Sequence, residues 1–287
     1  MKAVILAGGL GTRLLPFTKE IPKEMIPVYS IFEGRVVVKP IIQLIFEQLF
    51  EAGVRNFYVV VGYGKTTIIN HFTPNWNFVE YLQRRGKSLE AKCLENFYEK
   101  VEKSSISWVY QEVPLGTGHA ILKVEEYVDG PFIVCAGDSV FLGANVFTRL
   151  LSRFDEFGGN FIVVKSVDDP RRHGVAIAEP LSDDVFRVID IIEKPEKPPS
   201  NLANMSCYIF QLEVFKHLKE IKLSSRGEYE VTDAIRSIIN SGSTVYALNV
   251  SGLQRVDVGT PSSLIRALTK SYEFVHSLTK AINLQSL

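Results

Sequence analysis

The chain has 287 residues, of which 46% are hydrophobic and 22% are charged, as in an ordinary globular protein that buries a large core. Lys and Arg number 32 together, as do Asp and Glu, so the formal net charge is zero, which argues against a broad basic surface for nucleic acid or for an anionic membrane. The three cysteines show no CxxC spacing, so neither a zinc site nor a redox motif is supported. No stretch has the length of a membrane span, so we expect a cytoplasmic protein.

The first half of the chain alternates between predicted strands and predicted helices. Short runs rich in Val, Ile and Phe predict buried strands over residues 3–6, 57–61, 106–110, 132–135 and 161–164. Apolar residues at helical spacing predict helices over residues 40–52 and 145–157, and glycine follows each of them. This alternation is typical of an α/β domain with a mostly parallel sheet.

Later segments are predicted to be arranged differently. Residues 75–103 are charged and irregularly apolar, and we interpret them as a helical excursion on the surface. Strands over 185–192 and 205–211 follow one another without a helix between them. The remaining predicted elements are helices over 213–221 and 230–240, a strand over 244–250 and a closing helix over 261–278. We expect this half to wrap onto the first sheet and to form one wall of a cleft.

A glycine-rich segment follows directly from the first predicted strand, in the sequence Leu6-Ala7-Gly8-Gly9-Leu10-Gly11. Three glycines within four positions let the backbone turn sharply, and the exposed N–H groups of such a turn hold phosphate oxygens. The segment fits neither the GxxxxGK[ST] phosphate loop nor the GxGxxG motif, so a dinucleotide-dependent oxidoreductase is disfavoured. A phosphate-binding loop is favoured over the alternative, a turn whose glycines serve packing alone.

Two cationic residues, Arg13 and Lys23, come shortly after the glycine-rich segment. Either alone would be an ordinary surface charge, but the order of loop, arginine and lysine favours a site for an anionic ligand. The nearby residues Pro16, Pro22 and Pro27 predict that this connection is extended rather than helical.

Further short motifs occur along nearly the whole chain. In order, they are Thr18-Lys19, Ile21-Pro22-Lys23-Glu24-Met25, Gly62-Tyr63-Gly64-Lys65, Gln111-Glu112-Val113-Pro114-Leu115-Gly116, Gly137-Asp138, Gly174-Val175, Glu193-Lys194-Pro195, Gly227-Glu228, Thr232-Asp233-Ala234-Ile235 and Asp257-Val258-Gly259. Together with the glycine-rich segment, they closely resemble the bacterial-type UTP–glucose-1-phosphate uridylyltransferases, which are sugar-nucleotide pyrophosphorylases. No single motif defines the family, but their order does.

The resemblance implies an α/β fold that is Rossmann-like and glycosyltransferase-A-like, with a mostly parallel mixed sheet flanked by helices. It implies one nucleotidyltransferase domain over residues 1–287, in which the part up to about residue 140 binds the nucleotide and residues 141–287 form the sugar-binding wall and C-terminal helices. The implied substrates are UTP, with dTTP as an alternative, and glucose 1-phosphate; the implied cofactor is Mg²⁺. We expect a homo-oligomer without nucleic-acid or membrane partners.

Two aspartates are the candidate metal ligands. Asp138 follows the apolar strand at 132–135, and the carboxyl ends of parallel strands are where α/β sheets place their ligands. Asp257 precedes the closing helix, and two carboxylates suffice for Mg²⁺, which keeps waters or phosphate oxygens as its other ligands. By resemblance both residues are metal ligands. The residues alone leave open a turn role for Asp138 and a helix N-cap role for Asp257.

The remaining candidate residues are assigned by resemblance. The backbones of Ala7, Gly8, Gly9 and Gly11 are expected to bind the nucleotide. Gln111 and the Gly116 backbone match the positions that read the pyrimidine, and an amide offers both a donor and an acceptor to uracil. Lys194 is expected to bind the sugar phosphate, Glu193 the sugar hydroxyls, and the Gly174 backbone is expected to approach the sugar. His119 and His173 lie beside these motifs, and neither is expected to transfer a proton.

The chain departs from the family pattern at three places. Ser139 replaces a second aspartate, residues 30–38 separate two segments that are normally close, and Asn204-Met205-Ser206-Cys207 replaces a more apolar run with glycine that faces the sugar in relatives. Two functional alternatives stay open: a thymidylyltransferase that makes dTDP-glucose, and a non-catalytic relative that binds sugar nucleotides and regulates a partner. Against the second, Arg13 and Lys23 are both present, as are the two aspartates.

Overall fold

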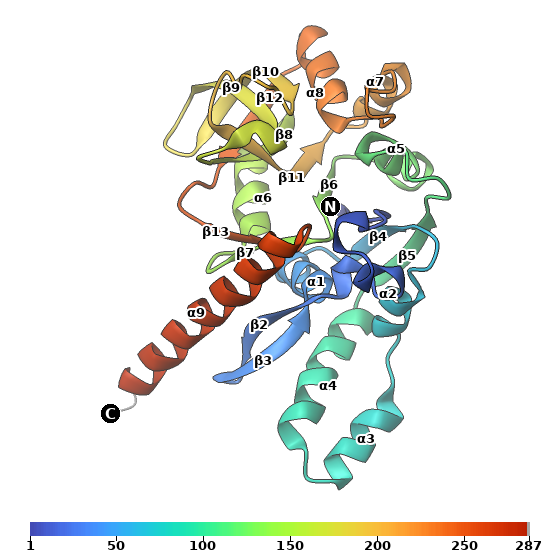
Figure 1. The fold of residues 1–287 in the computed structure, drawn as a ribbon, viewed down its shortest axis with the longest axis vertical. Helices are drawn as coiled ribbons and strands as arrows, with labels where there is room; N and C mark the ends of the chain where they lie inside the picture. Colours follow the sequence, from blue (N-terminus) through green and yellow to red (C-terminus); the bar gives the residue numbers. More distant parts are fainter. Residues whose placement is uncertain (286–287) are drawn as a thin grey trace.

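The computed structural model describes residues 1–285. Its main sheet has nine strands in the order β5-β4-β1-β6-β11-β8-β12-β10-β9, with a further pairing of β11 with β9 (Figure 1). The strands are β1 (Lys2–Ala7), β4 (Asn56–Val61), β5 (Ser105–Tyr110), β6 (Phe132–Ala136), β8 (Asn160–Ser166), β9 (Gly174–Pro180), β10 (Val185–Glu193), β11 (Leu202–Phe210) and β12 (Val245–Asn249).

The sheet is parallel in its first half and largely antiparallel in its second. Strands β5, β4, β1 and β6 pair in parallel, and so do β8 and β12. Strand β11 runs antiparallel to β6 and β8, and β10 runs antiparallel to β9 and β12. The expected mixed α/β sheet is thus confirmed. Parallel pairing does not extend across it, because four-residue connections such as 181–184 permit only a hairpin.

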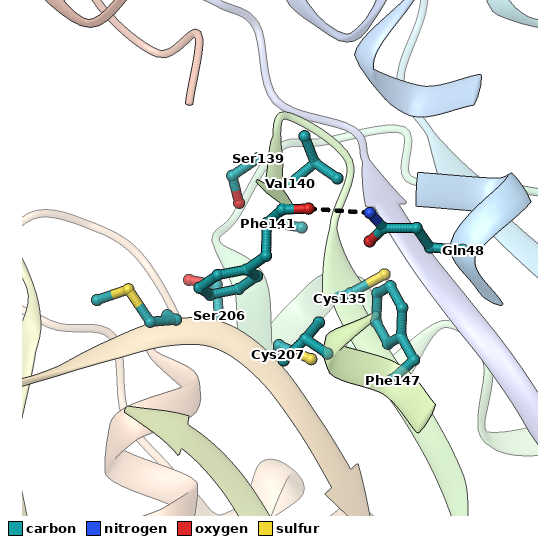
Figure 2. Close-up of a pocket in the computed structure, with 11 residues that line it drawn as sticks. Gln48, Cys135, Ser139, Val140, Phe141, Phe147, Ser206 and Cys207 are labelled. Carbon is teal, nitrogen blue, oxygen red and sulfur yellow. Dashed lines mark hydrogen bonds between the residues drawn. The ribbon is translucent and has the colours of Figure 1, made fainter. Parts of the chain in front are cut away.

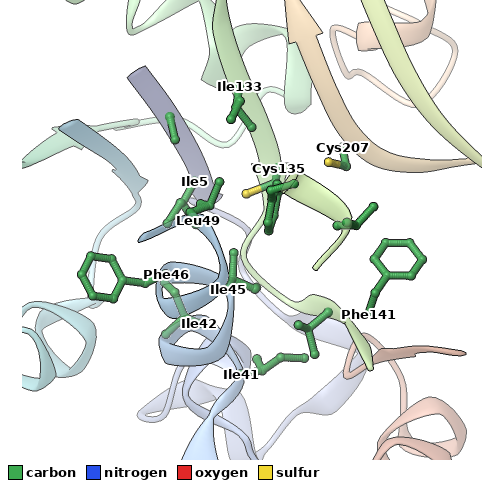
Figure 3. Close-up of a cluster of buried hydrophobic side chains, with 14 of the residues drawn as sticks. Ile5, Ile41, Ile42, Ile45, Phe46, Leu49, Ile133, Cys135, Phe141 and Cys207 are labelled. Carbon is green, nitrogen blue, oxygen red and sulfur yellow. The ribbon is translucent and has the colours of Figure 1, made fainter. Parts of the chain in front are cut away.

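Helices cover both faces of the sheet, because β1 presents alternate residues to two hydrophobic cores. Ala3 and Ile5 face the core that includes α1 (Ile41–Glu51) and α6 (Val146–Phe157). Figure 3 shows Ile5 and the α1 side chains of this core. Val4 faces the other core, under three shorter helices: α5 (Thr117–Leu122), α7 (Val214–Glu220) and α8 (Val231–Asn240). Burial on both faces explains why the strands read as continuous apolar runs.

Several smaller elements flank the sheet. The expected helical excursion is confirmed as α3 (Trp76–Arg84) and α4 (Ser88–Glu102), which follow α2 (Thr66–His71). The extra residues 30–38 lengthen a hairpin of β2 (Pro27–Phe32) and β3 (Arg35–Pro40), so the two segments that they separate remain paired. The closing helix α9 (Pro261–Gln285) packs against β2, where the Tyr29 N–H donates to the Ser271 hydroxyl at 3.2 Å (Figure 1).

The connection after the glycine-rich segment differs from the prediction. It was expected to be extended, but it contains three 3₁₀ turns: η1 (Thr12–Leu14), η2 (Phe17–Lys19) and η3 (Lys23–Met25). Pro16 and Pro22 lie at the N-caps of η2 and η3, where the missing proline N–H costs nothing. The sequence pattern also missed short elements whose length gives no periodicity: α2, α5, β9, β7 (Ser139–Leu142) and β13 (Gln254–Asp257).

A buried polar chain ties the hairpin to α1 and α2. The Lys39 ammonium lies 2.8 Å from Glu47, whose other oxygen accepts a hydrogen bond from the Gln43 amide at 2.8 Å. The Gln43 oxygen is 2.9 Å from Nε2 of His71, and the His71 ring stacks on Phe97 at 4.9 Å. Since the Gln43 NH₂ group faces a carboxylate, its oxygen must accept from His71, which therefore carries a proton on Nε2.

His71 is expected to make the protein less stable as the pH falls. Burial lowers the pKa of His71 to about 4, although Glu47 opposes this shift. In the unfolded chain the pKa of His71 is near 6.5. Between pH 6.5 and 4 the unfolded chain therefore binds a proton at His71 that the folded chain does not bind. The free energy of unfolding should therefore fall between about pH 6.5 and 4, by about 3 kcal/mol in total, and show no further loss from this group below pH 4.

Urea unfolding at a series of pH values measures this dependence. The His71→Phe variant keeps a ring against Phe97 and removes the titrating group, so its unfolding free energy should vary less over the same window. An equal slope for both proteins would assign the acid sensitivity to other groups.

Candidate active site

A cavity of about 560 Å³ lies between the glycine-rich loop after β1 and the strands of the second half. It is lined by eleven of the thirteen residues that the sequence singled out: Gly8, Gly9, Gly11, Arg13, Lys23, Gln111, Gly116, Asp138, Gly174, Glu193 and Lys194. The other two do not line it. Ala7 is fully buried as the last residue of β1, and Asp257 ends β13, two residues before Gly259, which does line the cavity.

The glycine-rich loop needs glycine for two distinct reasons. A side chain on Gly8 would meet the Gln111 amide oxygen at 2.5 Å, so the loop backbone can lie against Gln111 only without one. Gly11 has a φ of 68°, in the left-handed region, and its carbonyl accepts a hydrogen bond from the Thr18 hydroxyl at 2.7 Å. The loop therefore keeps its backbone close to the cavity, as phosphate binding requires.

Gln111 is held in one orientation by its neighbours. Its amide nitrogen donates to the Gly116 carbonyl at 3.2 Å and to Nδ1 of His119 at 3.0 Å, and its side chain is buried. Burial and the nearby Lys123 lower the pKa of His119, so the ring is neutral at pH 7 and its Nδ1 can accept. The oxygen of Gln111 faces Gly8. His119, which was given no role from sequence, thus positions the residue predicted to read the base.

Arg13, Lys23 and Asp138 all line this cavity. The Lys23 ammonium lies 2.5 Å from Asp138, and a side-chain carbon on Gly9 would lie 3.7 Å from that ammonium. Arg13 is exposed, and its guanidinium passes 3.2 Å from the corresponding position on Gly259. The structure therefore brings both predicted cations to the glycine-rich loop and to the first aspartate.

The electrostatics keep Lys23 and Asp138 charged. Burial alone would lower the pKa of Lys23, but the carboxylates of Asp138 and Glu24 raise it above its ordinary value. Burial alone would raise the pKa of Asp138, but Lys23, Arg255 and Arg13 together hold it below its usual range. Asp138 is thus an ionised acceptor in a site with cations around it.

Asp138 and Asp257 are brought together by the two-stranded sheet of β7 and β13. Asp257 pairs with Ser139, and the Val258 N–H donates to the Asp138 carbonyl at 3.1 Å. Within residues 1–285 no group of three or more His, Cys, Asp or Glu side chains is placed to hold a metal ion. Two carboxylates on such paired segments nevertheless suit Mg²⁺ bound with phosphate oxygens, so this donor set fits that ion.

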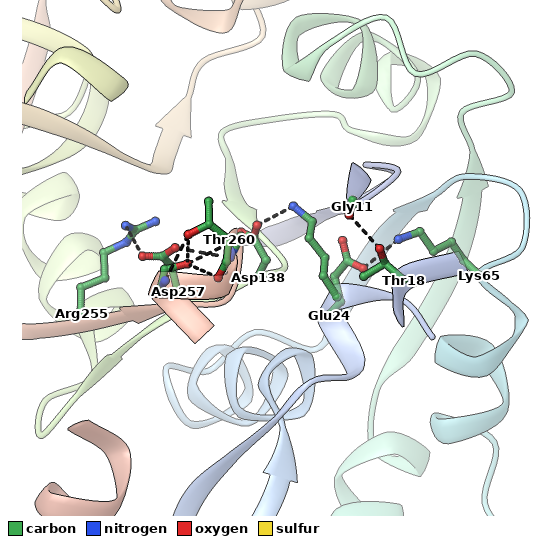
Figure 4. A network of polar contacts seen from close by, with 11 residues as sticks. Gly11, Thr18, Glu24, Lys65, Asp138, Arg255, Asp257 and Thr260 are labelled. Atoms are coloured by element: carbon green, nitrogen blue, oxygen red, sulfur yellow. Dashed lines mark hydrogen bonds and ion pairs between the residues drawn. The ribbon is translucent and has the colours of Figure 1, made fainter. Parts of the chain in front are cut away.

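A buried ion pair between Glu24 and Lys65 lies beside Lys23, and no role was predicted for either residue. Glu24 is 1% exposed and accepts from the Lys65 ammonium at 2.8 Å (Figure 4). Burial raises the pKa of Glu24, and Lys65 and Lys23 oppose this shift. Glu24 lies in the motif at residues 21–25 and Lys65 in the motif at residues 62–65, so the motifs pointed to both residues. Only the fold shows that these two motifs are in contact.

Glu193, which lines the cavity beside Lys194 and Gly174, is fixed on both carboxylate oxygens. One oxygen lies 3.3 Å from the Lys194 ammonium and 3.2 Å from the guanidinium of Arg226, and the other accepts from the Thr232 hydroxyl at 3.0 Å. A side chain on Gly174 would meet Thr232 at 2.6 Å, so glycine is required there. Arg226 was not expected at this site, because its place in an irregular loop gives no pattern in the sequence.

A much smaller cavity lies between β6, β7 and β11 (Figure 2). Its volume is about 10 Å³, and Cys135, Cys207 and Phe141 are among its lining residues. This space holds at most one water molecule and cannot admit a substrate. A substrate therefore does not bind in this space.

Comparison with known proteins agrees with this geometry. Residues 2–273 match the family described as nucleotidyl transferase. The chain is 35% identical to the UTP–glucose-1-phosphate uridylyltransferase of Bacillus subtilis, over 95% of this chain and 90% of that protein. A crystal structure of UDP-glucose pyrophosphorylase complexed with UDP-glucose superposes with a TM-score of 0.81 at 30% identity, over 95% of this chain and 98% of that one. A UTP-bound enzyme of the same name from Acinetobacter baumannii gives a TM-score of 0.81 at 27% identity, over 98% of both chains.

Proposed function

The chain belongs to the nucleotidyl transferase family, and from this premise we infer that it is a UTP–glucose-1-phosphate uridylyltransferase. The observation that carries the inference is one cavity lined both by a glycine-rich loop with two cations and by a carboxylate beside a lysine, Glu193 and Lys194. The first group suits a triphosphate, and the second suits a sugar phosphate. The similar structures bound to UTP and to UDP-glucose support the same reading over a thymidylyltransferase.

The reaction is an in-line displacement at phosphorus. An oxygen of glucose 1-phosphate attacks the α-phosphorus of UTP, a P–O bond forms to the sugar phosphate, and the bond to pyrophosphate breaks. The attacking phosphate is already ionised at neutral pH, so no side chain has to remove a proton.

Catalysis in this site rests on position and charge. Arg13, Lys23 and the loop N–H groups offset the charge that builds on the α-phosphoryl oxygens and on the leaving pyrophosphate. Asp138 and Asp257 would hold Mg²⁺, which when bound supplies further positive charge at the phosphates. Lys194 binds the phosphate of the sugar, and Glu193 accepts hydrogen bonds from its hydroxyls.

UTP and glucose 1-phosphate are expected to be the best substrate pair. Gln111 and Gly116 read an edge that uracil and thymine share, and the extra methyl of thymine changes binding by about 1–3 kcal/mol at most. The methyl alone should therefore lower activity with dTTP by up to about 200-fold, whereas ATP and GTP are expected to be too large for a pyrimidine slot. Pyrophosphate release from each nucleoside triphosphate with several sugar 1-phosphates tests this. A higher kcat/KM for a purine nucleotide, or for another sugar, would contradict the substrate assignment.

Assembly and location remain further proposals. A homo-oligomer is supported by apolar side chains that β3 and α9 expose side by side, Val36, Val38 and Tyr272 among them. None of the helices within residues 1–285 is long and apolar enough to cross a membrane. The cytoplasmic location stays a prediction from the sequence.

A further inference from the structure

Strand β11 carries a bulge where it borders the sugar end of the cavity. Asn204 pairs with Val164 of β8, and the next paired residue is Tyr208, opposite Ile162. Three residues of β11 thus stand against one of β8, and the extra backbone is accommodated at Ser206, whose φ is 53°. Such a conformation is unfavourable for serine, so neighbouring contacts must hold it in place.

The side chain of Asn204 holds the bulge from within. Its oxygen accepts from the Ser206 backbone N–H at 3.1 Å, and its nitrogen donates to the Tyr208 hydroxyl at 2.8 Å. A backbone N–H can only donate, so the amide has one possible orientation. Asn204 and Tyr208 are 6% and 2% exposed, and burial raises the pKa of Tyr208, which stays a protonated hydroxyl.

This arrangement leaves part of the amide unused. An asparagine offers two N–H donors and two lone pairs, and the bonds to Ser206 and Tyr208 use one of each. One donor and one lone pair of a nearly buried amide therefore remain, and Asn204, Ser206 and Tyr208 all line the substrate cavity. A hydroxyl group, which both donates and accepts, matches these two positions.

Asn204 also lies next to the predicted sugar contact. A side-chain carbon built on Gly174 would be 3.1 Å from a Glu193 oxygen and 3.6 Å from Cβ of Asn204, so both side chains border one small region. Behind the bulge, Ser206 and Cys207 pack against Phe141 around the 10 Å³ space, which leaves no room for the strand to retreat (Figure 2). The amide is therefore held at a fixed place beside Glu193.

We propose that Asn204, oriented by Tyr208 and Ser206, reads one hydroxyl of the hexose 1-phosphate and makes the enzyme selective for sugars that carry it. The proposal rests on the proposed uridylyltransferase function and assigns a specificity residue within that site. A buried amide left without its partner is costly, so a sugar that lacks the hydroxyl should be rejected far more strongly than one that lacks a methylene-sized group.

The test compares glucose 1-phosphate with its 2-, 3-, 4- and 6-deoxy analogues, with UTP held constant. The wild-type enzyme should lose at least about 10²-fold in kcat/KM with one of these analogues. In Asn204→Val, kcat/KM for glucose 1-phosphate should fall toward the value for that analogue, so that the ratio between them drops below about 5-fold, with the KM for UTP unchanged. Tyr208→Phe keeps the ring and removes the anchor of the amide, and it should lower the same ratio.

Asn77→Val is the matched control, because Asn77 is exposed on α3, away from the cavity. It should keep the wild-type ratios. If Asn204→Val does not fold, the ratio of kcat/KM values measured with Tyr208→Phe tests the proposal. Wild-type ratios in the folded variants, or a wild-type enzyme that accepts all four analogues equally, would overturn the proposal. Absence of any UDP-glucose with the wild-type enzyme would instead overturn the proposed function, so the two failures are distinguishable.

Discussion

The Asp138→Asn variant is expected to lose more than about 10²-fold in kcat while it remains folded. The carboxylate of Asp138 stays ionised because Lys23, Arg255 and Arg13 outweigh the effect of burial on its pKa. The amide has nearly the same shape but no charge, so it can neither pair with the Lys23 ammonium, 2.5 Å away in the wild type, nor act as an anionic ligand to Mg²⁺. Loss of both interactions weakens the same part of the site.

Steady-state kinetics over a range of Mg²⁺ concentrations, together with calorimetric titration of Mg²⁺ in the presence of UTP, measures this effect. The matched control is Asp155→Asn, an exposed position on α6, which should retain wild-type turnover. Wild-type turnover of Asp138→Asn, or full activity of the unaltered enzyme in excess chelator, would contradict the assignment.

The Arg13→Ala variant should lose about 10²–10³-fold in kcat with a much smaller change in KM. The Arg13 guanidinium is exposed and approaches Gly259, next to the second aspartate, at the phosphate end of the cavity. A charge held there contributes most when the α-phosphoryl group carries the additional charge of the transition state. Arg13→Lys should recover part of the activity, because it restores the charge without the planar fork of donors.

Rapid-quench measurement of a single turnover separates this effect from product release. Arg84→Ala, at an exposed position on α3, serves as the control for loss of an arginine. An Arg13→Ala enzyme with unchanged kcat and a raised KM would mean that Arg13 binds the ground state and the transition state equally.

Site residues that lie close together in the sequence could be predicted, whereas contacts between distant segments could not. The glycine-rich loop, Arg13 and Lys23 lie within one short stretch, and the loop's position after a strand follows from the apolar pattern. The contacts between distant segments could not be predicted from spacing. They include the pairing of Lys65 with Glu24 and of Arg226 with Glu193, which depend on how the sheet brings loops together.

Long elements of the fold could be predicted from the sequence, whereas short ones could not. Long periodic segments such as α1 and α6 were predicted within a residue or two of their ends. The short strands β7 and β13 carry too few residues to show alternation, and their pairing is set by the closure of the second half onto the first. The 3₁₀ turns after the loop were missed because proline disfavours a helix interior but not a helix start.

The pairing of β7 with β13 is also expected to set the stage of synthesis at which the enzyme becomes active. Asp138 emerges from the ribosome with the parallel half of the sheet, but its neighbour Asp257 follows only after β8 to β12 have been made. A domain generally folds as a unit, and synthesis delivers its N-terminal part first. If Asp138 and Asp257 hold Mg²⁺ as proposed, an unfinished chain carries the glycine-rich loop without the second carboxylate and should not consume UTP. Activity should then begin only when β13 has paired with β7.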